Sequence, residues 1–221
     1  MKPIWQGELV NRTTVEQDLM LDPERLLTYV TVRSLTVMIE ARQRHYEGYG
    51  VSAVAPVYDN DGHSKILAAS NYRPNPDEAP NDTRVCAEQA LIDNSIHEGD
   101  LSLGVLFVRG PKPDPDKPIV GCREGVRSLH LCRPCRARVL DVVGPQLLIV
   151  TFNDEDPEPT EAITLSQMLG YHDVGNVYPE LPDNKTARDV AIEALTNLSD
   201  LTMLKKPAQS HRVIKAGDRN C

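Results

Sequence analysis

The chain has 221 residues and a formal net charge of −8 at pH 7. Hydrophobic residues make up 40% of it and charged residues 25%, which excludes wholesale disorder and is typical of one large globular domain, or of one domain with an extension. The acidic balance disfavours nucleic-acid binding unless the surface keeps a local basic patch.

The cysteines are the first unusual feature. No apolar run approaches the ~20 residues of a membrane span, and the N-terminal residues lack the apolar stretch of a secretory signal. We therefore expect a cytoplasmic protein whose thiols stay reduced. The five cysteines are Cys86, Cys122, Cys132, Cys135 and Cys221. Four of them cluster, and two have C-x-x-C spacing, which indicates metal or redox chemistry.

The first half of the chain predicts a helix, a β-hairpin and a second helix. Asp22 followed by Pro23 is a helix-start signal, and apolar residues recur after it at helical intervals. The predicted elements are a helix over 23–46, strands over 51–58 and 65–72 around a turn at 60–62, a proline-rich loop over 73–84 and a helix over 85–99.

The second half alternates strands and helices. The predicted elements are a buried strand over 101–110, a proline-rich insertion over 111–130, a helix over 132–143, a strand over 146–152, an acidic loop over 153–161, a helix over 164–171 and an amphipathic segment from about 183. In the helix over 132–143, we expect Cys135, Val139 and Val142 to share the inward face. The order of elements predicts an α/β fold in which helices pack on a sheet.

Two short clusters carry the chemistry, Cys86-Ala87-Glu88 and Cys132-Arg133-Pro134-Cys135. Each lies at the predicted start of a helix, where free N–H groups and the helix dipole favour thiolates. Cys132 and Cys135 share a helical face. Together with Cys86 they supply three of the four ligands of a tetrahedral zinc ion, and the open corner can hold water. Glu88 is then placed to move a proton without being a ligand.

This arrangement resembles the cytidine deaminase superfamily, whose signature is His/Cys-x-Glu followed by Pro-Cys-x-x-Cys. The resemblance covers roughly residues 30–172 and, with Cys86 in first place, is nearest to the free-nucleoside deaminases. It implies a three-layer α/β/α fold with a mixed sheet of about five strands, a Zn²⁺ cofactor and a homo-oligomer, either dimer or tetramer. The domain limits become an extension over 1–22, a catalytic domain over 23–172 with the insertion 111–130, and a helical extension over 173–221.

The resemblance also implies an activity and substrate contacts. The activity is hydrolytic deamination of a cytosine nucleoside or nucleotide to the uracil product, with release of ammonia and with Glu88 as the proton shuttle. Tyr49 corresponds to an aromatic residue that packs on the pyrimidine, and Asn71 to one that binds the ribose. The Ala87 carbonyl lines the base pocket. Arg73 stands where the family has a ribose-binding carboxylate.

Other departures concern charge near the zinc ligands. Leu131 replaces the proline of the signature, and Gln89 replaces an arginine that hydrogen-bonds the zinc thiolates. Three thiolates leave zinc with a net negative set of ligands, so a nearby cation matters. Arg133, Arg136 or Arg84 could supply it.

Arginines are concentrated in the segment 123–138, where one acidic residue, Glu124, accompanies them. The arginines are Arg123, Arg127, Arg133, Arg136 and Arg138. Such a cluster could bind a phosphate bidentately, which predicts a nucleotide or otherwise modified cytosine compound in preference to plain cytidine. A solvated helix face is the simpler interpretation of the same arginines.

Several alternatives stay open. The cysteines could form a structural zinc knuckle with Cys122 as fourth ligand, or a redox C-x-x-C pair. The enzyme could act on a nucleoside antibiotic or on single-stranded nucleic acid, although the net charge disfavours a polynucleotide. The protein could also bind zinc for stability without catalysis. His130 is a candidate for substrate contact, because it lies near the zinc helix. Asn71 and Arg73 could simply be a polar strand end.

Overall fold

The structure is a computed structural model, and it describes residues 16–17, 22–44, 50–58, 64–72, 85–97, 102–113, 126–154, 156–182 and 184–205. The helices are α1 (Pro23–Arg44), α2 (Ala87–His97), α3 (Arg133–Val142), α4 (Leu165–Leu169), the π-helix η1 (Gly170–Val174) and α5 (Ala187–Lys205). The strands are β1 (Glu16–Gln17), β2 (Ser52–Tyr58), β3 (Ser64–Ser70), β4 (Ser102–Leu103), β5 (Val105–Gly110), β6 (Leu148–Asn153) and β7 (Glu161–Thr164).

Within the described residues the strands form one mixed sheet in the order β1-β3-β2-β5-β6-β7, and β4 pairs with β2. β2 and β3 form the predicted antiparallel hairpin, in which Val54 is opposite Ala68. β5 and β6 run parallel, with Phe107 opposite Val150. Five of the strands have four or more residues, while β1 and β4 have two each. The predicted α/β class with a mixed sheet is confirmed.

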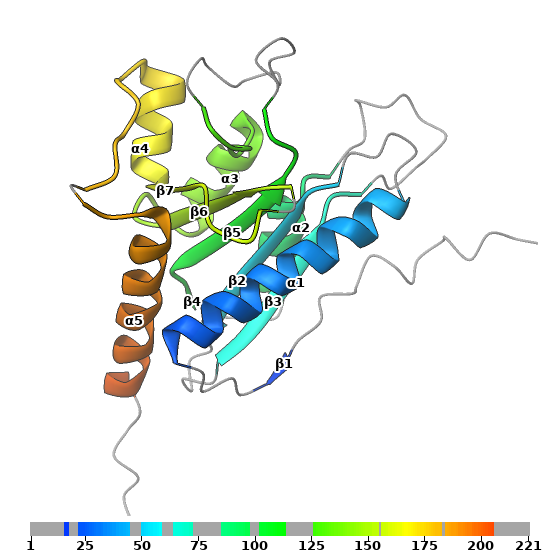
Figure 1. Cartoon of the computed structure of the whole chain (residues 1–221), viewed down its shortest axis with the longest axis vertical. Coiled ribbons are helices and arrows are strands. Elements are labelled where there is room, and N and C mark those ends of the chain that lie inside the picture. The colour runs from blue at the N-terminus through cyan, green and yellow to red at the C-terminus, as the bar shows by residue number, and fades with distance from the viewer. Residues whose placement is uncertain are drawn as a thin grey trace, which may run out of the picture.

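Helices cover both faces of this sheet, which gives three layers (Figure 1). Successive side chains of a strand point to opposite faces. In β5, Leu106 and Val108 join the core beneath α2 and α3, whereas Val105 and Phe107 join the core beneath α1 and α5. All four are buried. Because alternate residues of β5 are buried in opposite cores, the sheet is covered on both sides.

The two longest helices, α1 and α5, lie on the same face. The Asp22 carboxylate caps α1 by accepting the backbone N–H of Arg25 at 3.0 Å, as the helix-start signal predicts. α5 buries Ala187, Ala191 and Leu195 against that face. No helix in the described part of the chain is both long and apolar enough to cross a membrane.

The structure corrects two details of the predicted elements. The end of the predicted acidic loop, from Glu161, is the start of β7, which pairs antiparallel with β6. Its four residues are too few to show an alternating pattern behind the prolines that precede them. Val142, expected on the inward face of α3, is 39% exposed, whereas Cys135 and Val139 are buried. It is the last residue of α3 and lies at the end of the helix where burial stops.

Candidate metal centre

Backbone geometry brings three cysteines to the starts of two helices. Tyr72 and Val85 form an isolated antiparallel bridge, which leads the chain into Cys86. The Cys86 carbonyl accepts the N–H of Ala90 at 3.0 Å, so Cys86 begins α2. Cys132 is the N-cap residue of α3 in an extended conformation. Cys135 then lies in the first turn of α3, on the side of Cys132.

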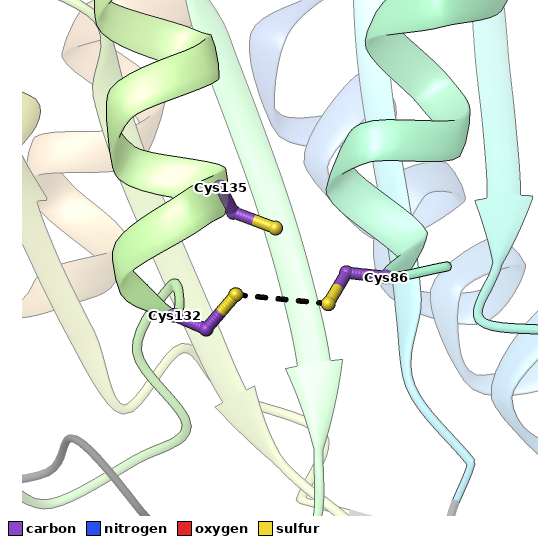
Figure 2. Close-up of side chains that lie close together, drawn as sticks. All are labelled: Cys86, Cys132 and Cys135. Carbon is purple, nitrogen blue, oxygen red and sulfur yellow. Dashed lines mark hydrogen bonds between the residues drawn. The ribbon is translucent and has the colours of Figure 1, made fainter. Parts of the chain in front are cut away.

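The three sulfurs converge, as Figure 2 shows. The Sγ atoms of Cys86 and Cys132 are 3.7 Å apart, and all three Sγ atoms lie within 4.8 Å of one another. A disulfide needs sulfurs about 2.0 Å apart, so these thiols are free. Tetrahedral zinc with Zn–S bonds of about 2.3 Å places its sulfurs about 3.8 Å apart. The cluster is therefore compatible with a zinc ion.

The three thiols shift one another's pKa values. Hydrogen bonds donated by the neighbouring thiols of Cys135 and Cys86 lower the pKa of Cys132 to about 2. Donation to Cys132 raises the pKa of Cys86 to about 12, with burial adding to the shift. The pKa of Cys135 is likewise raised, for the same reasons. A divalent cation bound by the three sulfurs would stabilise all of them as thiolates.

Arg136 supplies a positive charge beside this cluster. The side chain is buried, and its Nε and Nη2 atoms each donate to the Asp173 carboxylate at 3.0 Å. Its Nη1 atom donates to the carbonyl of Leu131 at 2.7 Å, one residue before Cys132. The charge of Arg136 adds to the hydrogen bonds from Cys135 and Cys86 that lower the pKa of Cys132. Of the two candidate cations that the structure describes, Arg133 and Arg136, Arg136 is the buried one and the one whose charge acts on Cys132.

Glu88 lies in the first turn of α2, two residues after Cys86, and is 4% exposed. The raised pKa values of Cys86 and Cys135 are due mainly to hydrogen bonds with the neighbouring thiols and to burial, and the negative charge of Glu88 adds a smaller contribution. The carboxylate therefore acts electrostatically on two of the three sulfurs. Ala87, between Cys86 and Glu88, is fully buried in the core beneath α2. A buried carboxylate on the helix that follows Cys86 has the position that a proton carrier for this candidate site would need.

The structure describes one of the three other residues expected to contact substrate. Asn71 is 2% exposed at the end of β3, and its Oδ1 atom accepts the N–H of Val51 at 2.8 Å. The backbone N–H of Asn71 also donates to the Val51 carbonyl at 3.1 Å. Asn71 thus fastens the end of β3 to the start of β2, which is what the polar-strand-end interpretation expects. Tyr49 and Arg73 lie outside the described residues, as do Arg84, Cys122 and Cys221.

Two other expectations concern His130 and the arginine cluster. The His130 side chain is fully buried, with Nε2 3.0 Å from Glu161 and Nδ1 2.8 Å from His172, so it is enclosed by protein instead of facing a substrate. Three arginines of the cluster approach carboxylates, Arg123 lies outside the described residues, and phosphate binding by the cluster stays a prediction. Arg138 pairs with Asp93 at 3.1 Å, and Arg136 and Arg133 both approach Asp173.

Sequence reasoning missed Asp173 and Glu161, the carboxylates that hold Arg136 and His130. Neither belongs to a motif. Asp173 lies in η1, just after the helix predicted over 164–171, and Glu161 is the last residue of the predicted acidic loop over 153–161. A buried carboxylate and its donors come from segments far apart in the chain, so their meeting becomes visible only in the fold.

Comparison with known proteins gives structural matches alone. No family model and no curated protein matches the sequence. The cytidine deaminase of Mycobacterium tuberculosis is 20% identical, with a TM-score of 0.43 over 64% of this chain and 91% of the other. That of Burkholderia pseudomallei is 17% identical, with a TM-score of 0.42 over 60% and 91%. That of Mycobacterium leprae is 20% identical, with a TM-score of 0.40 over 61% and 92%. Because these sequence identities and TM-scores are low, the chemistry of this chain is inferred from its own side chains.

Proposed function

We propose that this protein is a zinc-dependent hydrolase that deaminates a cytosine nucleoside or nucleotide to the uracil product and releases ammonia. Cys86, Cys132 and Cys135 would hold the ion, and Glu88 would carry the proton. The observation that supports this most directly is the convergence of three sulfurs within 4.8 Å of one another, with the Glu88 carboxylate electrostatically coupled to two of them.

The donor set fits a catalytic ion better than a structural one. Structural zinc sites usually have four protein ligands, and catalytic sites have three with an open position. Among the described residues, the cluster contains three cysteines and no further histidine, cysteine or acidic ligand. Zinc bound there supplies Lewis acidity, which makes water a nucleophile near neutral pH.

Glu88 is the residue that completes the chemistry. Hydrolytic deamination adds water across C4 of cytosine, so one proton must reach N3 and another must leave with the amino group as ammonia. A single carboxylate can accept the proton of the attacking water, deliver it to N3 and then carry the second proton to the departing nitrogen. Burial of Glu88 keeps bulk water from exchanging these protons. The Ala87 carbonyl, Asn71, Tyr49 and Arg73 remain proposed substrate contacts.

The test is ultraviolet-monitored deamination of cytidine, deoxycytidine, CMP, dCMP and larger cytosine nucleosides, with zinc content measured on the same samples. We expect at least one of these compounds to be deaminated by the wild type, and Glu88→Gln to abolish turnover while the protein keeps its zinc. Asp93→Asn is a matched control, since it removes a carboxylate five residues further along α2 that pairs with Arg138 at the surface. Zinc binding with no deamination of any cytosine compound would favour the non-enzymatic alternative.

Two further features of the proposal concern the setting of the enzyme. A centre of three free thiolates requires a reducing compartment, in agreement with the expected cytoplasmic location. The resemblance to cytidine deaminases implies a homodimer or homotetramer. Sedimentation equilibrium of the zinc-loaded protein measures that number directly.

A further inference from the structure

A buried carboxylate, Glu161, gathers four hydrogen-bond donors, three of them in the segment that leads into Cys132. Glu161 is the first residue of β7 and is 5% exposed. Its Oε1 atom accepts the backbone N–H of Arg127 at 3.2 Å and the hydroxyl of Tyr178. Its Oε2 atom accepts the hydroxyl of Ser128 and lies 3.0 Å from Nε2 of His130. Each carboxylate oxygen of Glu161 therefore has two hydrogen-bond donors.

Three of these four donors belong to the segment 126–131, which leads directly into α3. This segment lies outside the helices and strands, so side-chain contacts fix its path. The Arg127 carbonyl accepts Nδ2 of Asn153 at 3.0 Å. Leu129 packs closely over the end of β5, where a methyl group added at Gly110 would lie 2.4 Å from Leu129 Cδ2. Glu161 is the charged member of this set of contacts and makes the most of them.

The environment keeps Glu161 charged. Burial alone would raise its pKa, but hydrogen bonds from His130, Ser128 and Tyr178 outweigh burial and hold the pKa below the ordinary value of 4.5. A charged acceptor forms stronger hydrogen bonds than a neutral one, and a buried donor that loses its partner is costly. The segment before α3 is thus held to β7 by hydrogen bonds whose loss would lower the stability of the fold.

We propose that Glu161 is a positioning residue for the metal centre. By holding Arg127, Ser128 and His130 it determines where Cys132, two residues after His130, presents its sulfur. From the other side, Arg136 holds the Leu131 carbonyl. The inference rests on the proposed function only in taking the three cysteines as metal ligands. Residues that orient metal ligands in this indirect way typically change metal affinity or activity by about 10–100-fold when they are replaced.

The informative variant is Glu161→Gln, which keeps the size of the side chain but turns one accepting oxygen into an NH₂ donor, so that two of the four donors lose their acceptor. Tyr178→Phe is a milder second variant, because it removes a single donor from the partly exposed rim. Ser34→Ala is the matched control. Ser34 is fully buried in α1 on the opposite face of the sheet, where it accepts from Arg109 at 3.0 Å and donates to the Thr31 carbonyl.

The measurement is the rate of zinc release from the full-length protein to a colorimetric chelator, with the sulfur-to-metal charge-transfer band of the cobalt-substituted protein as a second readout. We expect Glu161→Gln to release zinc about 10-fold faster or more, Tyr178→Phe to change it in the same direction by less, and both to alter the cobalt spectrum. Ser34→Ala should lower the unfolding midpoint but release zinc at the wild-type rate with an unchanged spectrum.

Zinc release from Glu161→Gln at the wild-type rate, or equal acceleration in Ser34→Ala, would overturn the inference and leave Glu161 with a purely structural role. If Glu161→Gln does not fold, the zinc-release rate and cobalt spectrum of Tyr178→Phe decide in the same way. These outcomes are separate from deaminase activity. A wild type that holds zinc but deaminates nothing would refute the proposed function, and a wild type that holds no zinc would refute both.

Discussion

Replacement of Arg136 by methionine tests whether the buried cation of α3 organises the metal centre. Methionine fills a similar volume but can neither donate a hydrogen bond nor carry a charge. The change removes three hydrogen bonds at once, two to the Asp173 carboxylate and one to the Leu131 carbonyl. We expect a clear loss of stability and weaker zinc binding, because the carbonyl next to Cys132 loses its donor.

The magnitude follows from where each partner lies. The Asp173 side chain is 31% exposed, so water compensates much of its loss, and each of its two hydrogen bonds is worth about 1 kcal/mol. The Leu131 carbonyl belongs to a residue that is 1% exposed, so its lost partner costs about 1–3 kcal/mol. The expected fall in the free energy of unfolding is therefore about 3–5 kcal/mol, the range for removing one member of a buried ion pair.

Arg138→Met is the control on the same helix. Arg138 and Asp93 form an ion pair at 3.1 Å, with side chains 44% and 40% exposed, and such surface pairs contribute about 0–1 kcal/mol. Urea denaturation of the zinc-loaded proteins, with zinc affinity measured by competition, compares the two variants. If both lose equal stability and bind zinc equally well, the buried contacts of Arg136 do not hold the centre and the reasoning fails.

Two further predictions concern metal and pH. Chelation should lower the melting temperature, and zinc but not magnesium should restore it, since thiolates bind soft cations and magnesium prefers oxygen; restoration by magnesium would contradict the assignment. In the metal-free protein, burial raises the pKa of Glu161, but its hydrogen bonds lower that pKa by more. The pKa of Glu161 in the folded protein therefore lies below 4.5, and below pH 4.5 the unfolded chain binds more protons than the folded one. The resulting stability is complete above pH 4.5 and is lost as the pH falls through the folded pKa, a component that urea titrations should find missing in Glu161→Gln.

The chemical part of the site could be predicted from the sequence because it is encoded locally. Cys132 and Cys135 are one helical turn apart, and Cys86 and Glu88 share the first turn of another helix, so short-range geometry places them. Bringing the two helix starts together required only that β3 and β5 lie in one sheet, which the alternation of apolar segments predicts. The class of the fold followed from the same pattern.

The supporting contacts could not be predicted in this way. Glu161 and Asp173 act on residues more than thirty positions earlier in the chain, and nothing in their immediate sequence distinguishes them from surface acids. β7 was hidden because four residues behind prolines show no periodicity. The His130 ring could be placed near the zinc helix from its position, but whether it faced substrate or a buried carboxylate depended on where β7 lies.

Charge around the centre explains why the supporting contacts matter for chemistry as well as for stability. Three thiolates and one divalent zinc ion sum to −1, and such a set of ligands weakens the acidity that the metal confers on water. Arg136 brings +1 beside the sulfurs, and the carboxylate that balances Arg136, Asp173, is 31% exposed, where water screens it. The buried part of the centre is then close to neutral before Glu88 is counted. On this reasoning Arg136→Met should lower kcat more than its loss of bound zinc accounts for, whereas an effect confined to zinc occupancy would show that Arg136 acts by position alone.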